Sequence, residues 1–229
     1  DQRGTQRGGH GPPGCRPSIH SPNDRGCRVM RPLFFTGTGT DIGKTHILCA
    51  LIRAWRESGR TMRVLKPVIS GFDPSALNDT DTIRLMRANG DPLTGEGVQA
   101  VSPWRFRAPV SPDLAARKER RELVLDQVVG WCLDHIDREM PTVIEGAGGV
   151  MSPIASDGLN LDLIRELDAH PVVVAGSYLG TISHTLTALR ALDGRCTVIL
   201  NDHPRSDTPI TETARTIARF APRAEVRIF

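Results

Sequence analysis

The fold is decided by the stretch Phe34-Phe35-Thr36-Gly37-Thr38-Gly39-Thr40-Asp41-Ile42-Gly43-Lys44-Thr45. An apolar strand leads into a glycine-rich turn, and a helix begins near Lys44. In such a turn the backbone N–H groups and the positive end of the helix bind phosphate, the lysine reaches the outer phosphates, and the threonine hydroxyl ligates Mg²⁺. The stretch therefore predicts a nucleoside triphosphate site at a strand-to-helix turn.

The spacing of the glycines departs from the usual form of this loop. The first glycine of the standard pattern falls at Thr38, and Gly37 stands one residue earlier. The residues on either side of the turn still support a phosphate loop, because apolar residues precede it and others follow Lys44 at helical spacing. An ordinary strand-to-helix turn is the alternative, and the Gly-Lys-Thr at the start of the helix argues against it.

Strands and helices alternate beyond this turn. We expect strands over 31–35, 61–68, 141–145, 171–175, 197–200 and 225–228, and helices over 43–58, 79–89, 122–139, 159–168, 181–192 and 210–220. Residues 90–121 are rich in Pro and Gly and are expected to form a long loop. The alternation predicts an α/β fold, a P-loop NTPase-like parallel sheet with helices on both faces, in a single domain.

The charge is distributed unevenly along the 229 residues. Residues 1–29 carry five Arg and two Asp and so supply the whole net charge of +3, while the remaining 24 basic and 24 acidic residues cancel. A neutral body argues against nucleic acid or an anionic membrane as a partner. Since residues 1–29 hold few large aliphatic side chains, we expect a disordered N-terminal extension there and a folded domain over 30–229. The five scattered Cys fit free thiols in a reducing compartment.

Lysine is rare in this chain. There are three Lys against 26 Arg, so a lysine here marks a place where a compact ammonium is needed. This applies to Lys44 and Lys66, which fall in the stretches described here, while an incidental surface residue is the alternative for Lys118. Lys66 follows the apolar Val64-Leu65 at the end of a predicted strand, and we expect it to clamp a transferring phosphoryl group or a carboxylate-like group. We expect an exposed charge that contributes little to folding. A structural lysine with a buried stem is the alternative.

Glu145 ends another apolar strand and is followed by Gly146-Ala147-Gly148-Gly149. An acid in this position is expected to ligate Mg²⁺, and the glycines let another backbone approach closely. A turn or helix-capping carboxylate is the alternative. Mg²⁺ takes one or two carboxylates beside phosphates and water, and the spacing leaves Asp73, Asp79 and Asp81 open as the second.

Two more strand ends carry polar or glycine-rich sequence. The helix start within 176–184 is able to receive an anion such as a substrate carboxylate. His184 in that stretch fits a structural hydrogen bond better than a catalytic role. Asn201-Asp202 follows the strand expected over 197–200 and either reads a purine edge or forms a turn.

Taken together, these residues resemble the ATP-dependent dethiobiotin synthetase family. The phosphate loop over 36–45, Lys66-Pro67-Val68-Ile69-Ser70-Gly71, Glu145-Gly146-Ala147-Gly148-Gly149 and Asn201-Asp202 occur in the family's order. The stretches 103–112 and 179–184 also look like that family, so the resemblance covers 30–202. It implies a cytoplasmic homodimer with ATP, Mg²⁺, CO₂ and 7,8-diaminononanoate as partners. One amine takes up CO₂ as a carbamate, ATP phosphorylates the carbamate, and the other amine closes the ring.

The resemblance also implies a role for each residue. Lys44 and Lys66 are the catalytic residues, Thr45, Asp81 and Glu145 surround Mg²⁺, and Ser70 touches the diamine. Leu179, Gly180 and Thr181 of the partner subunit receive the carboxylate tail, and Asn201 contacts adenine. The complete nucleotide site comprises Asp41, Ile42, Gly43, Lys44, Thr45, His46, Asp81, Glu145, Gly146, Ala147, Gly148, Asn201 and Asp202.

Other P-loop proteins remain as alternatives. Ligases of the cobyrinic acid amidating class usually carry a glutaminase domain, for which this chain has no room. A partition-type ATPase switch has a signature lysine that falls at position 39, which is Gly39 here. A nucleotide kinase has an Arg-rich lid, and none is evident.

Overall fold

The computed structural model describes residues 30–137, 139–202 and 209–229. The expected extension over 1–29 lies outside the described residues. Within them, no helix is long and apolar enough to cross a membrane.

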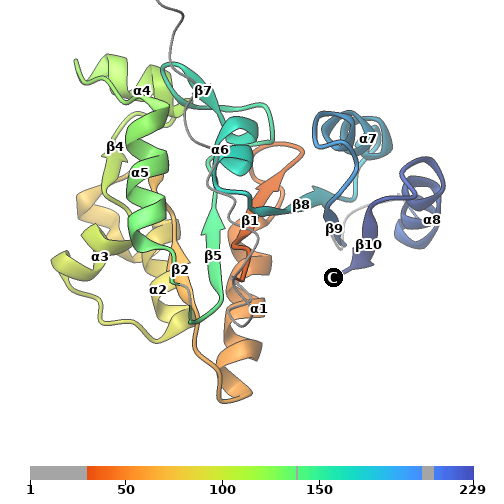
Figure 1. Ribbon diagram of the computed structural model, residues 1–229, viewed down its shortest axis with the longest axis horizontal. Helices are drawn as coiled ribbons and strands as arrows, with labels where there is room; N and C mark the ends of the chain where they lie inside the picture. Colours follow the sequence, from red (N-terminus) through yellow and green to blue (C-terminus); the bar gives the residue numbers. More distant parts are fainter. Residues whose placement is uncertain (1–29, 138, 203–208) are drawn as a thin grey trace, which may run out of the picture.

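A six-stranded sheet in the order β10-β9-β8-β1-β5-β2 forms the centre of the molecule (Figure 1). Its strands are β1 (Leu33–Gly37), β2 (Arg63–Leu65), β5 (Thr142–Glu145), β8 (His170–Gly176), β9 (Thr197–Asn201) and β10 (Glu225–Ile228). All neighbouring strands are parallel, and Phe35 of β1 lies opposite Glu145 on one side and Val172 on the other. The predicted parallel sheet is confirmed, and its strands bring their carboxyl ends to one edge.

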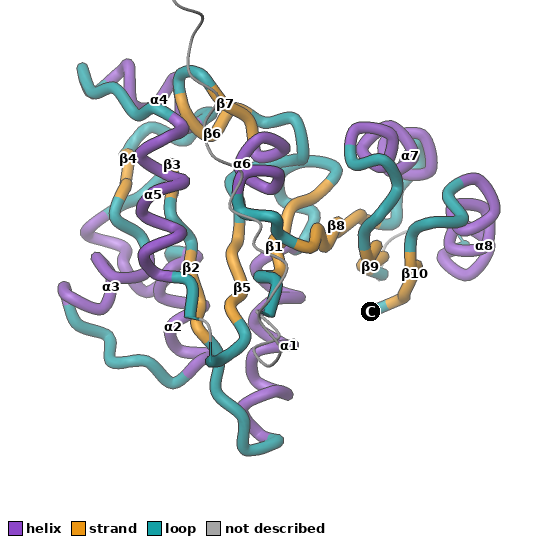
Figure 2. Tube along the Cα trace, in the orientation of Figure 1, coloured by secondary structure: helices purple, strands orange, loops and turns teal. Residues whose placement is uncertain are grey.

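Helices cover both faces of this sheet, as predicted (Figure 2). Alternate residues of each strand face opposite ways, so Phe34 packs on one face and Phe35 on the other. The face of Phe35 is covered by α1 (Lys44–Glu57) and α2 (Asp81–Asn89). The face of Phe34 is covered by α5 (Leu125–His135), α6 (Asn160–Glu166), α7 (Thr181–Ala191) and α8 (Ile210–Phe220).

The strand expected over 61–68 is in fact two strands in two sheets. β2 ends at Leu65, and β3 (Val68–Ser70) pairs in parallel with β4 (Trp104–Phe106) in a separate two-stranded sheet. The chain leaves the central sheet at Lys66, whose N–H donates to the carbonyl of Val101 at 2.9 Å. Pro67 follows and has no N–H to continue a ladder.

The long loop expected over 90–121 is wrong as well. In addition to β4, the segment holds α3 (Gly95–Val101) and α4 (Pro112–Lys118), and a 3₁₀ helix, η1 (Pro74–Asp79), precedes α2. The Thr94 side chain caps α3 by accepting from Gly97 N–H at 3.0 Å, and Pro112 opens α4, where its missing N–H costs nothing. Pro and Gly therefore mark helix boundaries here and not one continuous loop.

Two further differences concern short elements and helix ends. A small antiparallel hairpin of β6 (Pro153–Ala155) and β7 (Gly158–Leu159) follows β5 and was not expected. The helix expected over 122–139 is shorter, because α5 ends at His135 and Ile136 takes an extended conformation. The Asp137 carboxylate then accepts from the backbone N–H of Met140 at 3.1 Å, which fixes a turn in place of another helical turn.

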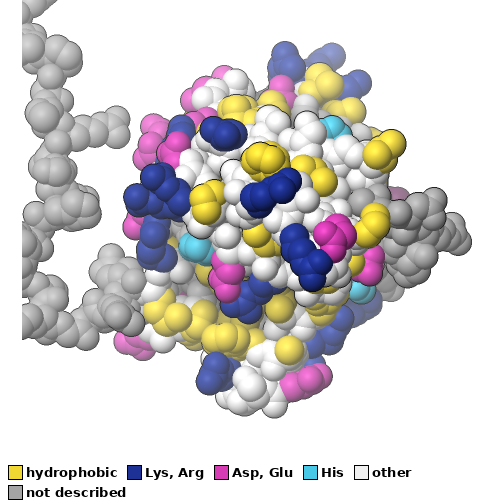
Figure 3. Space-filling model, turned by 90° about the vertical axis from the view of Figure 1, so that its right-hand side faces the viewer, with side chains coloured by type: hydrophobic (Ala, Val, Ile, Leu, Met, Phe, Trp, Pro, Cys, Tyr) yellow, Lys and Arg dark blue, Asp and Glu magenta, His cyan; other side chains and the backbone are white. Residues whose placement is uncertain are grey.

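The face formed by α7 and α8 is mixed in character (Figure 3). Hydrophobic side chains stand among basic and acidic ones on this face. Phe220, the last residue of α8, is exposed. A shallow groove between the two helices is lined by Leu186, Arg190 and Asp193, among other residues.

Candidate active site

The phosphate loop joins β1 to α1 at the carboxyl edge of the sheet. Gly43, the residue before the helix, has φ 91°, a left-handed conformation that glycine adopts without strain. The Asn201 side chain donates from Nδ2 to the carbonyl of Ile42 at 3.0 Å, and a Cβ added to Gly43 would come within 2.3 Å of that nitrogen. Asn201 therefore fastens the end of β9 to the loop, and only glycine fits at position 43.

The Lys44 side chain folds back over the phosphate loop. Its Nζ atom donates to the carbonyl of Gly39 at 3.0 Å, and the side chain is buried. The ammonium thus lies across the mouth of the loop, the position from which such a lysine reaches phosphate oxygens. Burial and the neighbouring charge of Lys66 lower the pKa of Lys44, while Glu145 opposes that shift.

A second glycine-rich loop, residues 146–149, packs directly on the phosphate loop. Gly146 N–H donates to the carbonyl of Phe35 at 2.9 Å, and Val150 N–H donates to the carbonyl of Gly37 at 3.1 Å. A Cβ added to Gly149 would come within 3.0 Å of that same Gly37 oxygen. The glycines after Glu145 allow the two backbones to touch, which brings the end of β5 beside the nucleotide loop.

Lys66 and Glu145 form a buried ion pair at this edge, and the partly exposed Asp81 joins them in one ionic cluster. Lys66 Nζ lies 2.8 Å from Glu145 Oε1 and 3.2 Å from Asp81 Oδ2. Lys66 and Glu145 are 3% and 1% exposed, so the expectation of an exposed lysine is wrong. The cause is the exit from the central sheet at Leu65, which places the next residue beneath α2 and beside β5.

The charges of this cluster support one another. Burial opposes the charged form of Lys66, but Glu145 and Asp81 outweigh it and raise the pKa of the lysine. Burial also opposes ionisation of Asp81, but Lys66 outweighs it and the pKa of Asp81 is lowered, with help from Thr45 and Arg84. Lys66 is therefore a fixed ammonium and Asp81 a fixed carboxylate at neutral pH.

Three oxygen-bearing side chains in the cluster fit a magnesium ion. Thr45 Oγ1 donates to Glu145 Oε1 at 2.7 Å, and Thr45 lines the same cavity as Asp81. The other oxygen, Glu145 Oε2, is buried and has no hydrogen-bond partner within the described part of the chain. Across those same residues no group of three or more His, Cys, Asp and Glu gathers to hold a metal. Two carboxylates and a hydroxyl suit Mg²⁺, which completes its shell with phosphate oxygens and water.

These groups line one cavity of about 740 Å³. Its floor is the edge of the central sheet, and the opposite wall comes from the small β3–β4 sheet, through Ser70 and the segment 109–112. Gly71 N–H donates to the carbonyl of Ala108 at 3.1 Å, which ties the two parts of that wall together. Of the expected site residues, the cavity is lined by Asp41, Gly43, Lys44, Thr45, His46, Lys66, Ser70, Asp81, Glu145, Gly146, Ala147 and Gly148.

Comparison with known proteins agrees with this geometry. A family model described as an AAA domain matches residues 31–227. The ATP-dependent dethiobiotin synthetase BioD of Caulobacter sp. strain K31 is 45% identical over 212 residues, which are 86% of this chain and 90% of that protein. The protein of the same name from Methylobacterium nodulans is 43% identical over 203 residues, 84% of this chain and 90% of its own length. The chain belongs to the dethiobiotin synthetase family. A third protein of that name, from Caulobacter vibrioides, is 50% identical over 168 residues, 72% of this chain and 75% of its own.

Some residues that the family resemblance points to lie away from the cavity. Leu179 is 97% exposed, Gly180 is the left-handed residue before α7, and the Thr181 hydroxyl donates to the carbonyl of Gly176 at 2.6 Å. None of the three lines the cavity of its own chain. The Ile42 side chain lies against Gly37, and Ile42 does not line the cavity either.

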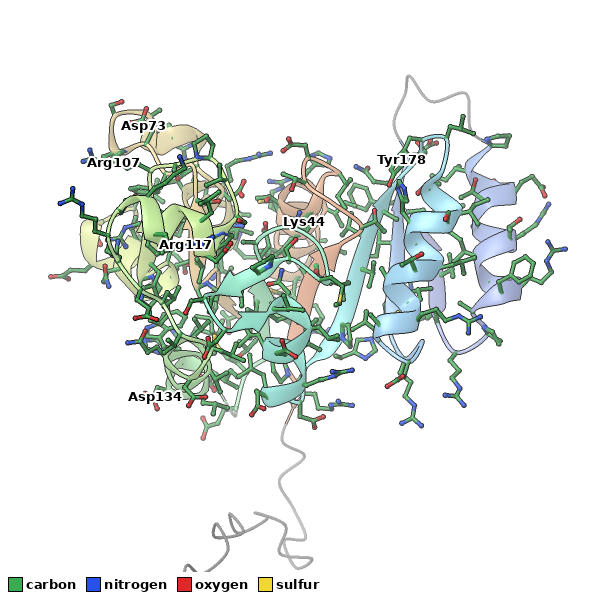
Figure 4. The ribbon with its side chains drawn as sticks, turned by 90° about the horizontal axis from the view of Figure 1, so that it is seen from above. Lys44, Asp73, Arg107, Arg117, Asp134 and Tyr178 are labelled. Atoms are coloured by element: carbon green, nitrogen blue, oxygen red, sulfur yellow. The ribbon has the colours of Figure 1, made fainter. Side chains whose placement is uncertain are left out.

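The remaining acidic candidates are not equivalent. Asp73 is exposed, and its carboxylate accepts from Ser75 N–H at 2.8 Å in a turn before η1. In Figure 4, Lys44 lies between the segment that carries Asp73 and Arg107 and the segment that carries Tyr178. Of Asp73 and Asp81, only Asp81 lines the cavity. Asp202 follows β9 on the surface.

Two residues of the cavity wall were not expected from the sequence. Ser152 accepts from Gly149 N–H at 2.8 Å and holds the second glycine loop in place. Arg84 lines the cavity from α2, one turn after Asp81. Helical spacing from Asp81 was the signal for Arg84, but an arginine on a polar helix face has no distinctive pattern among 26 arginines.

Tyr178 connects the phosphate loop with α7. Its hydroxyl lies 2.9 Å from His184 Nδ1 and 3.5 Å from Thr38 Oγ1. This contact gives His184 the structural hydrogen bond that the sequence favoured over a catalytic role.

Proposed function

We propose that this chain catalyses the ATP-dependent formation of dethiobiotin from 7,8-diaminononanoate and CO₂, a reaction of biotin biosynthesis. The observation that carries the proposal is the ionic cluster of Lys66, Glu145 and Asp81, which lines one cavity together with the phosphate-loop Lys44. It occurs in a chain that belongs to the dethiobiotin synthetase family. The cavity has room for a polyphosphate and a small acceptor together.

The chemistry consists of three bond changes. One amine of the substrate attacks CO₂, so a C–N bond forms and a proton is released to give a carbamate. A carbamate oxygen attacks the γ-phosphorus, and the bond between that phosphorus and ADP breaks. The second amine attacks the carbamoyl carbon, which closes the cyclic urea and expels inorganic phosphate and a proton.

The residues of the cavity act mainly by position and charge. Lys44 leaves the carbonyl of Gly39 to bind the outer phosphates, and Lys66 stabilises the carbamate and the anhydride formed from it. Phosphoryl transfer needs alignment and charge neutralisation more than covalent catalysis, so two lysine side chains in one cavity suit it. A carbamate is already anionic and does not need a general base.

Mg²⁺ is proposed as the cofactor. Thr45, Asp81 and Glu145 would hold it, and the unpartnered Glu145 Oε2 atom supports that assignment. When bound, the ion neutralises charge on the phosphates and orients them.

The outer parts of the site are proposed from family membership together with the positions of the residues. Ser70 contacts the diamine from the small sheet, and Asn201 with Asp202 lies near the base of the nucleotide. Leu179, Gly180 and Thr181 do not line the cavity of their own chain, so a homodimer in which they serve the partner's substrate is the arrangement that uses them. We also propose a cytoplasmic location for the protein and residues 30–229 as its synthetase domain.

Phosphate release tests this function directly. The purified chain is incubated with ATP, Mg²⁺ and bicarbonate, with or without 7,8-diaminononanoate, and inorganic phosphate and dethiobiotin are measured. We expect both products only with the diamine. If ATP binds and the diamine stimulates neither product, the synthetase function is wrong while the nucleotide site stands.

A further inference from the structure

Arg84 is an uncommitted cation on the wall of the cavity. It lies on α2, one helical turn after Asp81, and both residues line the same space. Its guanidinium is exposed and makes no hydrogen bond or ion pair with any other residue that the structure describes.

The position of Arg84 follows from the packing of its helix. α2 packs with α1 in one apolar cluster, and Arg84 lines the same cavity as Thr45 and His46 at the start of α1. In agreement with this placement, burial raises the pKa of Cys49 on α1, and Arg84 and Arg53 oppose that rise.

The charges that line the cavity leave the guanidinium of Arg84 available to bind an anion. The charged residues that line the cavity are Asp41, Asp81, Glu145, Lys44, Lys66 and Arg84, three of each sign. Lys66 is held by the two carboxylates, and Lys44 is held by a carbonyl of its own loop. Without Arg84 the lining has a net negative charge, which opposes an anionic nucleotide.

We propose that Arg84 binds the outer phosphates of ATP and stabilises the charge on the γ-phosphoryl group during its transfer. This inference rests on the proposed function, since it requires ATP in this cavity. A guanidinium binds two phosphate oxygens at once, which an ammonium does not do. The substrate carboxylate is the other anion available, but the neighbours of Arg84 are the phosphate-loop helix and the proposed magnesium ligands.

The test compares Arg84→Gln and Arg84→Lys with a matched control, Arg53→Gln. Arg53 is exposed on α1, also influences Cys49, and does not line the cavity. Binding of ATP and of ADP is measured by calorimetry, and the KM values for ATP and 7,8-diaminononanoate are measured by steady-state kinetics. We expect Arg84→Gln to weaken ATP binding about tenfold, the usual effect of losing a charge-assisted hydrogen bond, and to weaken ADP binding less. Arg84→Lys recovers part of the loss, and Arg53→Gln binds as the wild type does.

The outcomes separate this inference from the function on which it rests. If the wild type binds ATP and Arg84→Gln binds it equally well, Arg84 has no role at the phosphates. If only the KM for 7,8-diaminononanoate rises, the guanidinium binds the carboxylate and the inference is wrong. A wild type that binds no ATP overturns the proposed function and this inference together. Thermal denaturation of each variant, which we expect to match the wild type, identifies any effect that comes from misfolding.

Discussion

Replacing Lys66 with Met tests how the cluster contributes to stability. The change keeps the length of the side chain but removes the ammonium that lies 2.8 Å from a carboxylate only 1% exposed. Removing one partner of a buried ion pair typically costs about 3–5 kcal/mol, because the other charge is left uncompensated. The second contact, to Asp81, adds little, since that carboxylate is 37% exposed and water screens it. We therefore expect a loss near the lower bound, about 3 kcal/mol, which lowers the melting temperature by about 6–12 °C in a domain of this size.

The measurement is urea denaturation at neutral pH, with Glu145→Gln and the double variant completing a cycle. The double variant has no uncompensated buried charge, so we expect it to be more stable than Lys66→Met alone, a result that requires direct coupling of the two residues. A loss below about 1 kcal/mol for Lys66→Met, the range of an exposed pair, would refute the reasoning from burial. Turnover should be lost in Lys66→Met in either case, if Lys66 stabilises the carbamate.

Three further outcomes follow from the geometry. Asp81→Asn should raise the Mg²⁺ concentration needed for half-maximal phosphate release, whereas Asp73→Asn, a change at an exposed turn, should leave it unchanged; equal responses would exclude Asp81 as the ligand. Gly149→Ala places a methyl group 3.0 Å from a carbonyl of the phosphate loop and should weaken ATP binding in calorimetry, while Gly130→Ala, on α5 with open space around it and outside the cavity lining, should not. Burial lowers the pKa of His170, so the folded state favours the neutral imidazole. The free energy of unfolding therefore keeps the full contribution of His170 above the ordinary histidine pKa of about 6.5, and it falls as the pH drops through the lower pKa of the folded state. In denaturation measured between pH 7 and pH 5, His170→Gln should reduce that fall, and an unchanged slope would assign it to other groups.

The parts of the fold that the sequence predicted are those with a regular period. The strand before Gly37 was predicted from its continuous apolar run and the helix after Lys44 from its helical spacing, and α8 and β10 occupy the predicted ranges. The segment 66–121 was predicted poorly because its elements are short. Three-residue strands such as β3 and β4 show no measurable period, and Pro and Gly near helix starts look like loop signals.

The sequence predicted those site residues that lie at the ends of apolar strands. Lys66 and Glu145 each end an apolar run, and a parallel sheet must bring such ends together. What the sequence did not predict depends on tertiary contacts. The burial of Lys66 arises from the separation of two sheets, and the place of Arg84 on the wall depends on how α2 packs against α1. The choice of Asp81 over Asp73 likewise comes from the path of the chain between Ser70 and α2.

The chain passes from the central sheet to the small sheet at Lys66, so the walls of the cavity are supported by two separate sheets. The nucleotide-facing side is anchored in the central sheet, while Ser70 and the segment 109–112 are anchored in the small sheet. Substitutions in the small sheet are therefore able to reshape the space that we propose for the acceptor, while the phosphate loop keeps its support in the central sheet. An enzyme with this arrangement is able to evolve a new substrate specificity and still bind the same nucleotide.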